Sequence, residues 1–274
     1  MIPAFLLAFR EGLEAALILG IVLSVLHRVG RREQERMVWL GAGTAALSSL
    51  AAGAGLYALG VSFEGRAEEI FEGLAMLMAT GVLTWMIFWM DRQGRSIQAE
   101  LEKDVQRATA GDGRWAIFSL AFVAVFREGI ELALFLTAAT FSATAVAVVT
   151  GALLGLAAAV LAGWLLFAST ARLDVRAFFR VTSILLIFFA AGLVAHGIHE
   201  LNEAGIVPAI VEHVWDLNPV LDENSGLGQI LKALFGYNGN PSLTEVMVYV
   251  GYWVVVLTAL KHRKTLAKQV AAPA

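Results

Sequence analysis

The chain has 274 residues, of which 58% are hydrophobic and 16% charged, with a mean hydropathy of +0.72 and a net charge of −3. Soluble domains contain roughly 45–50% apolar and about 25% charged residues, so this balance indicates an integral membrane protein. The small net charge argues against a nucleic-acid-binding protein and against a polybasic membrane anchor. The absence of cysteine excludes disulfides, thiolate metal sites and cysteine-ligated iron–sulfur clusters in this chain.

Seven apolar segments are long enough to cross a membrane, because a bilayer core of roughly 30 Å needs about 20 residues of helix. They lie near 3–26, 37–61, 70–90, 115–140, 143–169, 178–198 and 243–260. We therefore predict an all-α integral membrane protein with seven transmembrane helices. Residues 1–274 would form a single transmembrane domain, and residues 199–242 would form a long connection before the last helix.

The basic residues predict how the chain is oriented in the membrane. Sixteen of the 20 Lys and Arg residues lie in the segments 27–36, 91–114, 170–180 and 261–274. Cytoplasmic connections carry an excess of Lys and Arg, so we assign these segments to the inner side. The prediction is an N-terminus outside, a C-terminus inside and an outer side that is mainly acidic.

Charged residues interrupt the first and the fourth of these segments. The stretches "AFREGLEAAL" at 8–17 and "VFREGIELAL" at 125–134 share the pattern Arg-Glu-Gly-x-Glu. Their charged residues are Arg10, Glu11, Glu14, Arg127, Glu128 and Glu131. At about 1.5 Å per residue, both motifs lie roughly 12–24 Å along their helices, well inside the hydrocarbon. A charge at that depth costs at least about 2.5–3.5 kcal/mol on insertion scales, so both charged faces should turn into the bundle.

The two copies lie on helices that run in opposite directions. This arrangement is typical of an inverted repeat of three plus three helices, to which the seventh helix would be added. In such transporters the substrate site lies near the bilayer midplane, where the two repeats meet. We therefore expect the two motifs to face each other there.

Together the motifs contain four carboxylates and two guanidinium groups, a formal excess of two negative charges. This excess predicts a cation site, in which the two arginines orient the carboxylates. Carboxylate oxygens suit hard cations such as Fe³⁺, Mg²⁺, Mn²⁺ or Ca²⁺, and the absence of cysteine disfavours Cu(I). The charge pattern alone does not distinguish among the hard cations.

Three other interpretations of the motifs stay open. The pairs Arg10–Glu14 and Arg127–Glu131 could be internal salt bridges that act as polar glue between helices, although this leaves Glu11 and Glu128 without a role. The carboxylates could instead relay protons while another solute moves. A membrane di-iron oxidase is a third interpretation, but such sites typically use Glu-x-x-His pairs, whereas both motifs here repeat Glu without His.

These motifs and their surroundings resemble the oxidase-dependent iron permeases, the Ftr-type and EfeU-type proteins, over nearly the full length. The similar stretches are "MIPAFLLAFREGLEAALILGIVL", "EEIFEGLAMLMATGVLTWMIFWM", "AFFRVTSILLIFFAAGLVAHGI" and "NEAGI". The resemblance implies high-affinity iron uptake across the cytoplasmic (inner) membrane. It implies Glu11, Glu14, Glu128 and Glu131 as iron ligands, and an extracytoplasmic oxidase or iron-binding partner that delivers ferric iron. Iron would be the substrate, and we expect neither a permanently bound cofactor nor an enzymatic activity.

Two further groups near the predicted outer surface are candidate entry or secondary sites. Glu69 and Glu72 begin the third segment, where acids are also favourable simply because they lie at a helix N-terminus. His196, His199 and Glu203 share one helix face at the end of the sixth segment and could hold a metal. They could equally form a hydrated polar rim. Glu72 and Glu203 match glutamates of the family, whereas the two histidines are not uniformly present in it.

The fifth segment carries a small residue at every fourth position, at Gly151, Gly155, Ala159 and Gly163. Such a stripe is typical of a face on which two membrane helices pack closely, and less often of a hinge. Gly12 and Gly129, inside the two motifs, would likewise leave room for a neighbouring helix or a close ligand.

Overall fold

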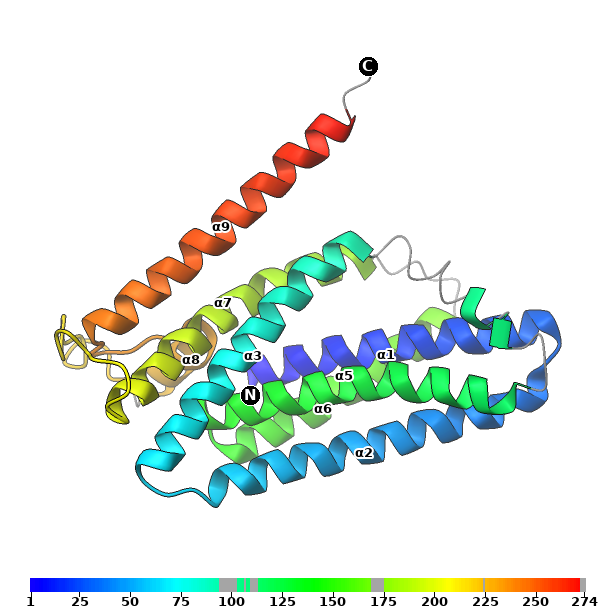
Figure 1. Ribbon diagram of the computed structural model, residues 1–274, viewed down its shortest axis with the longest axis horizontal. Helices are drawn as coiled ribbons and strands as arrows, with labels where there is room; N and C mark the ends of the chain where they lie inside the picture. Colours follow the sequence, from blue (N-terminus) through cyan, green and yellow to red (C-terminus); the bar gives the residue numbers. More distant parts are fainter. Residues whose placement is uncertain (94–102, 106, 109–112, 169–174, 224, 272–274) are drawn as a thin grey trace.

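The computed structural model describes the chain except for residues 94–102, 106, 109–112, 169–174, 224 and 272–274. The regular structure of the described part is helical (Figure 1). The long helices are α1 Ile2–Val29, α2 Glu35–Val61, α3 Arg66–Gln93, α5 Arg114–Ser142, α6 Ala145–Ala168, α7 Val175–Glu203 and α9 Leu243–Ala271. A short α8 spans Gly226–Phe235, and Arg32–Gln34 forms a 3₁₀ turn. The predicted all-helical class is confirmed for the described residues.

Six of the long helices cover their predicted segments, and α6 lies within the predicted segment 143–169, the last residue of which is outside the described part. In the described part, five helices are long and apolar enough to cross a membrane by length and composition alone, namely α2, α3, α6, α7 and α9. The helices α1 and α5 are as long, but each carries three charged residues in its middle. The helix α7 continues to Glu203, past its predicted end at residue 198, because backbone hydrogen bonding continues where hydropathy falls. The connection between α7 and α9 therefore begins after Glu203 and contains α8.

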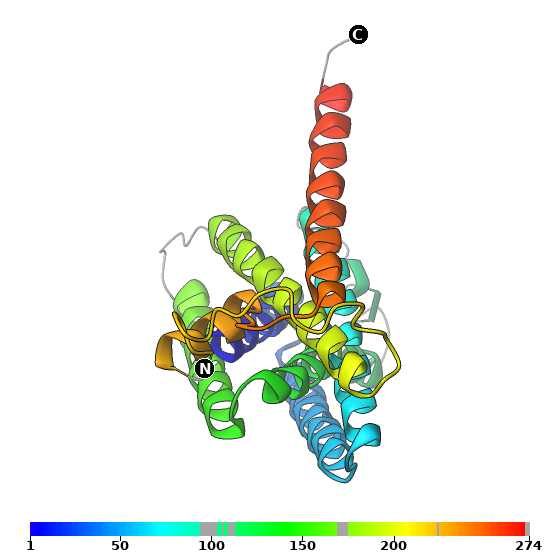
Figure 2. The same ribbon diagram turned by 90° about the vertical axis from the view of Figure 1, so that its left-hand side faces the viewer.

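The most extensive helix contacts pair α1 with α6, α2 with α5 and α3 with α7. The helices α1 and α5 also lie side by side and run in opposite directions (Figure 1). The last helix, α9, packs against α7 near its start and then projects away from the others (Figure 2). Apolar side chains such as Leu50 of α2 and Val255 of α9 are largely exposed, as expected for surfaces that face lipid.

The packing of α1 on α6 has a counterpart in the packing of α5 on α2. Small residues make both contacts. Between α1 and α6, the contacts pair Ala4 with Gly151, Gly12 with Ala159 and Ala16 with Gly163. Between α5 and α2, the equivalent contacts pair Ala121 with Gly41, Gly129 with Ser49 and Ala133 with Gly53. In each case the α5 residue lies 117 positions after its α1 equivalent, the same separation as between Arg10 and Arg127. Helices α1 and α5 thus use equivalent faces against equivalent partners.

The small-residue stripe of α6 faces α1, as predicted for a packing face. Gly12 and Gly129 also face a neighbouring helix, α6 and α2 respectively. Close approach of backbones gives membrane helices the van der Waals contact that holds them together. These contacts therefore position the two charged helices.

We expect Gly155→Leu to destabilise the bundle. A Cβ atom at this position would lie 2.9 Å from the backbone nitrogen of Phe9 and 3.0 Å from Cβ of Ala8, so α1 and α6 would have to separate. Overpacking of this kind costs about 1–3 kcal/mol. A lower melting temperature in detergent would report the loss. Gly43→Leu is the matched control, because nothing lies within 4 Å of a Cβ atom there; an equal effect of both variants would contradict the packing argument.

Candidate metal-binding site

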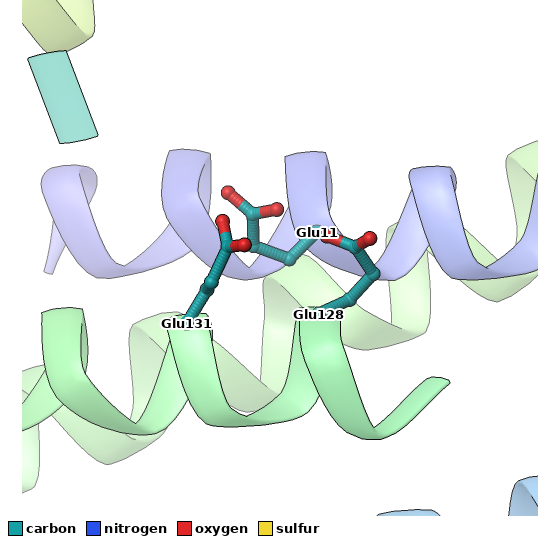
Figure 3. A group of neighbouring side chains, drawn as sticks. All are labelled: Glu11, Glu128 and Glu131. Carbon is teal, nitrogen blue, oxygen red and sulfur yellow. The ribbon is translucent and has the colours of Figure 1, made fainter. Parts of the chain in front are cut away.

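Side chains from α1 and α5 converge where the two helices lie side by side. Figure 3 shows Glu11 on α1 and Glu128 and Glu131 on α5, with their carboxyl groups turned toward one another. One carboxylate oxygen from each residue lies within 4.8 Å of the other two. Among the described residues, no other group of three or more His, Asp or Glu side chains has its ligand atoms within this distance of one another. The geometry suits a cation bound by oxygen ligands.

The charged faces of both motifs turn into the bundle, as the cost of a charge in hydrocarbon requires. Arg10, Glu11 and Glu128 are at most 3% exposed. Glu14 and Glu131 are each 8% exposed. Glu14 is therefore buried on the same helix as Glu11, but it does not join the group of three within 4.8 Å. The structure brings three of the four predicted ligands together.

Several of these buried oxygens have no hydrogen-bond donor. Both carboxylate oxygens of Glu11, and Oε2 of both Glu14 and Glu131, are buried without a hydrogen-bond partner among the described residues. A buried carboxylate that lacks compensation is strongly destabilising. A cation between these oxygens would supply that compensation.

The two arginines of the motifs lie in different surroundings. Arg10 is fully buried, whereas the side chain of Arg127 is 38% exposed. The Nε atom of Arg127 donates a hydrogen bond of 3.2 Å to Oε1 of Glu131 and lies 3.9 Å from Oε1 of Glu128. Its guanidinium carbon lies 4.5 Å from the ring centroid of Trp89 on α3, a cation–π contact. The pair Arg127–Glu131, which the salt-bridge interpretation of the motifs contains, is thus present.

The predicted face of His196, His199 and Glu203 lies on α7, and both histidines are close to glutamates. The Nε2 atom of His199 lies 3.4 Å from Oε1 of Glu203, and the Nδ1 atom of His199 lies 3.1 Å from Oε1 of Glu245. His196 lies 3.7 Å from Glu200 on the same helix. These contacts are pairwise and do not bring three ligand atoms together within 4.8 Å. Glu69 and Glu72, in the first turns of α3, are partly exposed and lie outside the group of three glutamates.

Glu245 is a buried carboxylate that the sequence analysis missed. It accepts hydrogen bonds from the backbone nitrogen of Ser242, at 3.1 Å, and from Nδ2 of Asn238, at 2.8 Å. Its own backbone nitrogen donates to Oγ of Ser242, so the two residues form a capping box at the start of α9. The pattern Ser-x-x-Glu in "SLTE" is the sequence signal for such a capping box and could have identified Glu245. Together with His199, this network fastens α9 to α7.

The long apolar helices define an all-α membrane protein, in which buried glutamates from two helices lie close together. The chain matches the model of the iron permease FTR1 family over residues 1–270 and belongs to that family. The family resemblance seen in the sequence is therefore confirmed.

The relatives include proteins named ferrous iron permease EfeU. The Yersinia pestis protein is 37% identical over 276 residues, which cover 99% of this chain and 98% of that protein. The Shigella sonnei protein is 38% identical over 261 residues, or 94% of this chain and 95% of the relative. Both names describe permeases, which are transporters rather than enzymes. No solved structure matches the chain.

Replacing Glu245 by Ala should destabilise the protein. The change leaves the buried groups that now bond to Glu245 without an acceptor, which costs about 1–3 kcal/mol. The melting temperature in detergent should fall. Glu212→Ala is the control, because Glu212 is exposed in the connection between α7 and α9. If Glu245→Ala melts like the control, the network does not fasten α9.

Proposed function

We propose that the protein is an iron permease of the cytoplasmic membrane that carries iron inward through Glu11, Glu14, Glu128 and Glu131. One observation carries the proposal: in a chain of the iron permease FTR1 family, buried carboxylates of both motifs converge at the contact between α1 and α5. Iron is the substrate of this site. The relatives' names support the same cargo.

In the proposed topology all seven long helices cross the membrane, with the N-terminus outside and the C-terminus inside. The 28 residues of α1 span about 42 Å, more than a bilayer core of roughly 30 Å. The burial of its charged side chains supports a transmembrane position for this helix, and the same holds for Glu128 and Glu131 of α5. The matched packing of α1 on α6 and of α5 on α2 supports an inverted repeat of α1–α3 and α5–α7, with α9 added.

In the proposed mechanism, iron exchanges water for carboxylate oxygens between α1 and α5. The four glutamates and two arginines carry a formal charge of −2, so an iron ion offsets the buried negative charge. Arg127 holds Glu131 in place, and Arg10 is buried beside Glu11. A smaller role in gathering cations at the outer end is proposed for Glu72 and Glu203.

Two arguments about the oxidation state of the iron point in opposite directions. Hard carboxylate ligands favour ferric iron, delivered from outside by an oxidase or an iron-binding protein. The charge of −2 is balanced by a ferrous ion, and the relatives are named for ferrous iron. Transport assays should therefore supply both ions, and Mn²⁺ as a competing hard cation.

Glu11→Gln and Glu128→Gln should each lower iron uptake at least 10-fold in proteoliposomes that contain this chain alone. The amide keeps the shape of the side chain but removes its charge, so the site loses affinity for the cation. Glu212→Gln is the control. If both site variants take up Fe²⁺ and Fe³⁺ at the parental rate, the proposed mechanism is wrong. Iron-independent proton flux through the parental protein would favour the proton relay instead.

The same variants should be at least as stable as the parent without metal, because removing a buried uncompensated charge relieves its desolvation. Iron should raise the melting temperature of the parent. A ligand at 100 times its dissociation constant stabilises by about 2.7 kcal/mol. Glu11→Gln should lose most of this shift. A lower melting temperature of the variant without metal would show instead that the carboxylate is structural.

A further inference from the structure

One side of the motif in α5 opens to a cavity. It has a volume of about 440 Å³ and is lined by Ile18 of α1 and by one face of α5 from Ser119 to Glu128. It begins at Arg127 and Glu128 and extends toward the start of α5, over about 13 Å of helix. We call this cavity the α5 groove. In the proposed orientation, the start of α5 lies at the inner surface.

Two positions equivalent to lining residues of the α5 groove are fully buried. The shift of 117 residues that relates the packing of α1 to that of α5 maps Ala124 onto Leu7. The same shift maps Ile18 onto Phe135. Leu7 and Phe135 are both fully buried, and both belong to the core that also contains Met76 of α3. The two halves of the pathway thus differ, although their motifs share one sequence pattern.

The two arginines of the motifs differ in exposure in the same way as the residues around them. Arg127, which lines the α5 groove, is 38% exposed, whereas its equivalent Arg10 is fully buried. Trp89 lies against the guanidinium of Arg127 and links it to α3. Arg127 also bonds to Glu131, one of the converging glutamates. A cation that leaves toward the groove must pass this guanidinium.

We propose that the structure is the inward-facing state of the permease: the α5 groove is the cation exit path, and Arg127, positioned by Trp89, is its inner gate. Leu7 and Phe135 close the equivalent path to the outside. This inference rests on the proposed function and adds to it the exit path and the positioning residue Trp89. In the opposite state the two halves exchange roles, so that the groove beside α5 closes and the one beside α1 opens.

The position of Arg127 gives the gate its direction. While a cation occupies the site, its charge and that of Arg127 compete for the carboxylate of Glu131. When the cation leaves, the guanidinium pairs with Glu131 and restores part of the compensation that the carboxylates lose. The same positive charge then opposes return of a cation from the groove. Trp89 keeps the guanidinium at this point because its ring face attracts the charge.

Single cysteines test the state directly, because the chain contains none of its own. Ala124→Cys and its equivalent Leu7→Cys would be reacted with a membrane-impermeant maleimide on right-side-out and inside-out vesicles. We expect Ala124→Cys to react from the inner side at least 10-fold faster than Leu7→Cys reacts from either side. Equal rates, or fast labelling of Leu7→Cys from outside, would overturn the assignment. Glu33→Cys and Glu64→Cys, beyond opposite ends of α2, report the sidedness of the vesicles.

The role of Trp89 is tested by iron uptake in proteoliposomes. Trp89→Leu should lower the uptake rate at least fivefold, and Trp89→Phe should keep at least half of the parental rate because it retains an aromatic face. Trp85→Leu is the matched control, since Trp85 lies one turn away on α3 and stacks on Trp89. It should stay within twofold of the parent. Parental uptake by Trp89→Leu, or equal loss with Phe and Leu, would overturn the positioning role.

The labelling result does not depend on iron uptake, so the proposed iron site and the proposed inward-facing state are tested separately. Parental uptake by Glu11→Gln and Glu128→Gln would remove the proposed function. Loss of uptake in these variants, together with equal labelling of Ala124→Cys and Leu7→Cys, would remove the inward-facing state alone.

Discussion

The concentration of carboxylates between α1 and α5 is the constraint on which the rest of the structure depends. Three converging glutamates, a fourth beside them and two arginines lie within helices that are otherwise apolar. A helix with three charged residues in its middle is stable in lipid only when other helices cover that face. The contact between α1 and α5 supplies part of this cover, because their glutamates converge there, and Trp89 of α3 lies over Arg127. The contact between α1 and α5 therefore serves both the packing of these helices and the proposed cation binding.

Much of this arrangement follows from the sequence, because it depends on local periodicity. The apolar segments, the spacing of Arg10 and Glu14, and the stripe from Gly151 to Gly163 each appear within one helix. The contacts between distant segments do not follow in this way. Glu245 approaches His199 across 46 positions, and Trp89 covers Arg127 from another helix. Periodicity shows which face of a helix is buried, but not which partner covers it.

The same limit applies to the ligand set. Helical geometry places Glu11 and Glu14 within one arc, yet only Glu11 lies within 4.8 Å of both Glu128 and Glu131. The choice between them depends on the offset of α5 along α1, two helices whose motifs lie 117 positions apart in the sequence. A contact between helices that are distant in the sequence thus decides which carboxylates meet.

The equivalent packing of the two halves also affects the free energy of the proposed switch between a site open to one side of the membrane and a site open to the other. In the proposed transport cycle, opening the outer half would expose Leu7 and Phe135, at a cost of about 1.5–3 kcal/mol for each large side chain. Closing the α5 groove would bury Val123, now 63% exposed, and its neighbours. Because the two halves pack through equivalent faces, the apolar area exposed on one side is offset by area buried on the other. The free energies of the two states then stay close, and a difference of a few kcal/mol in cation affinity is enough to shift the balance between them.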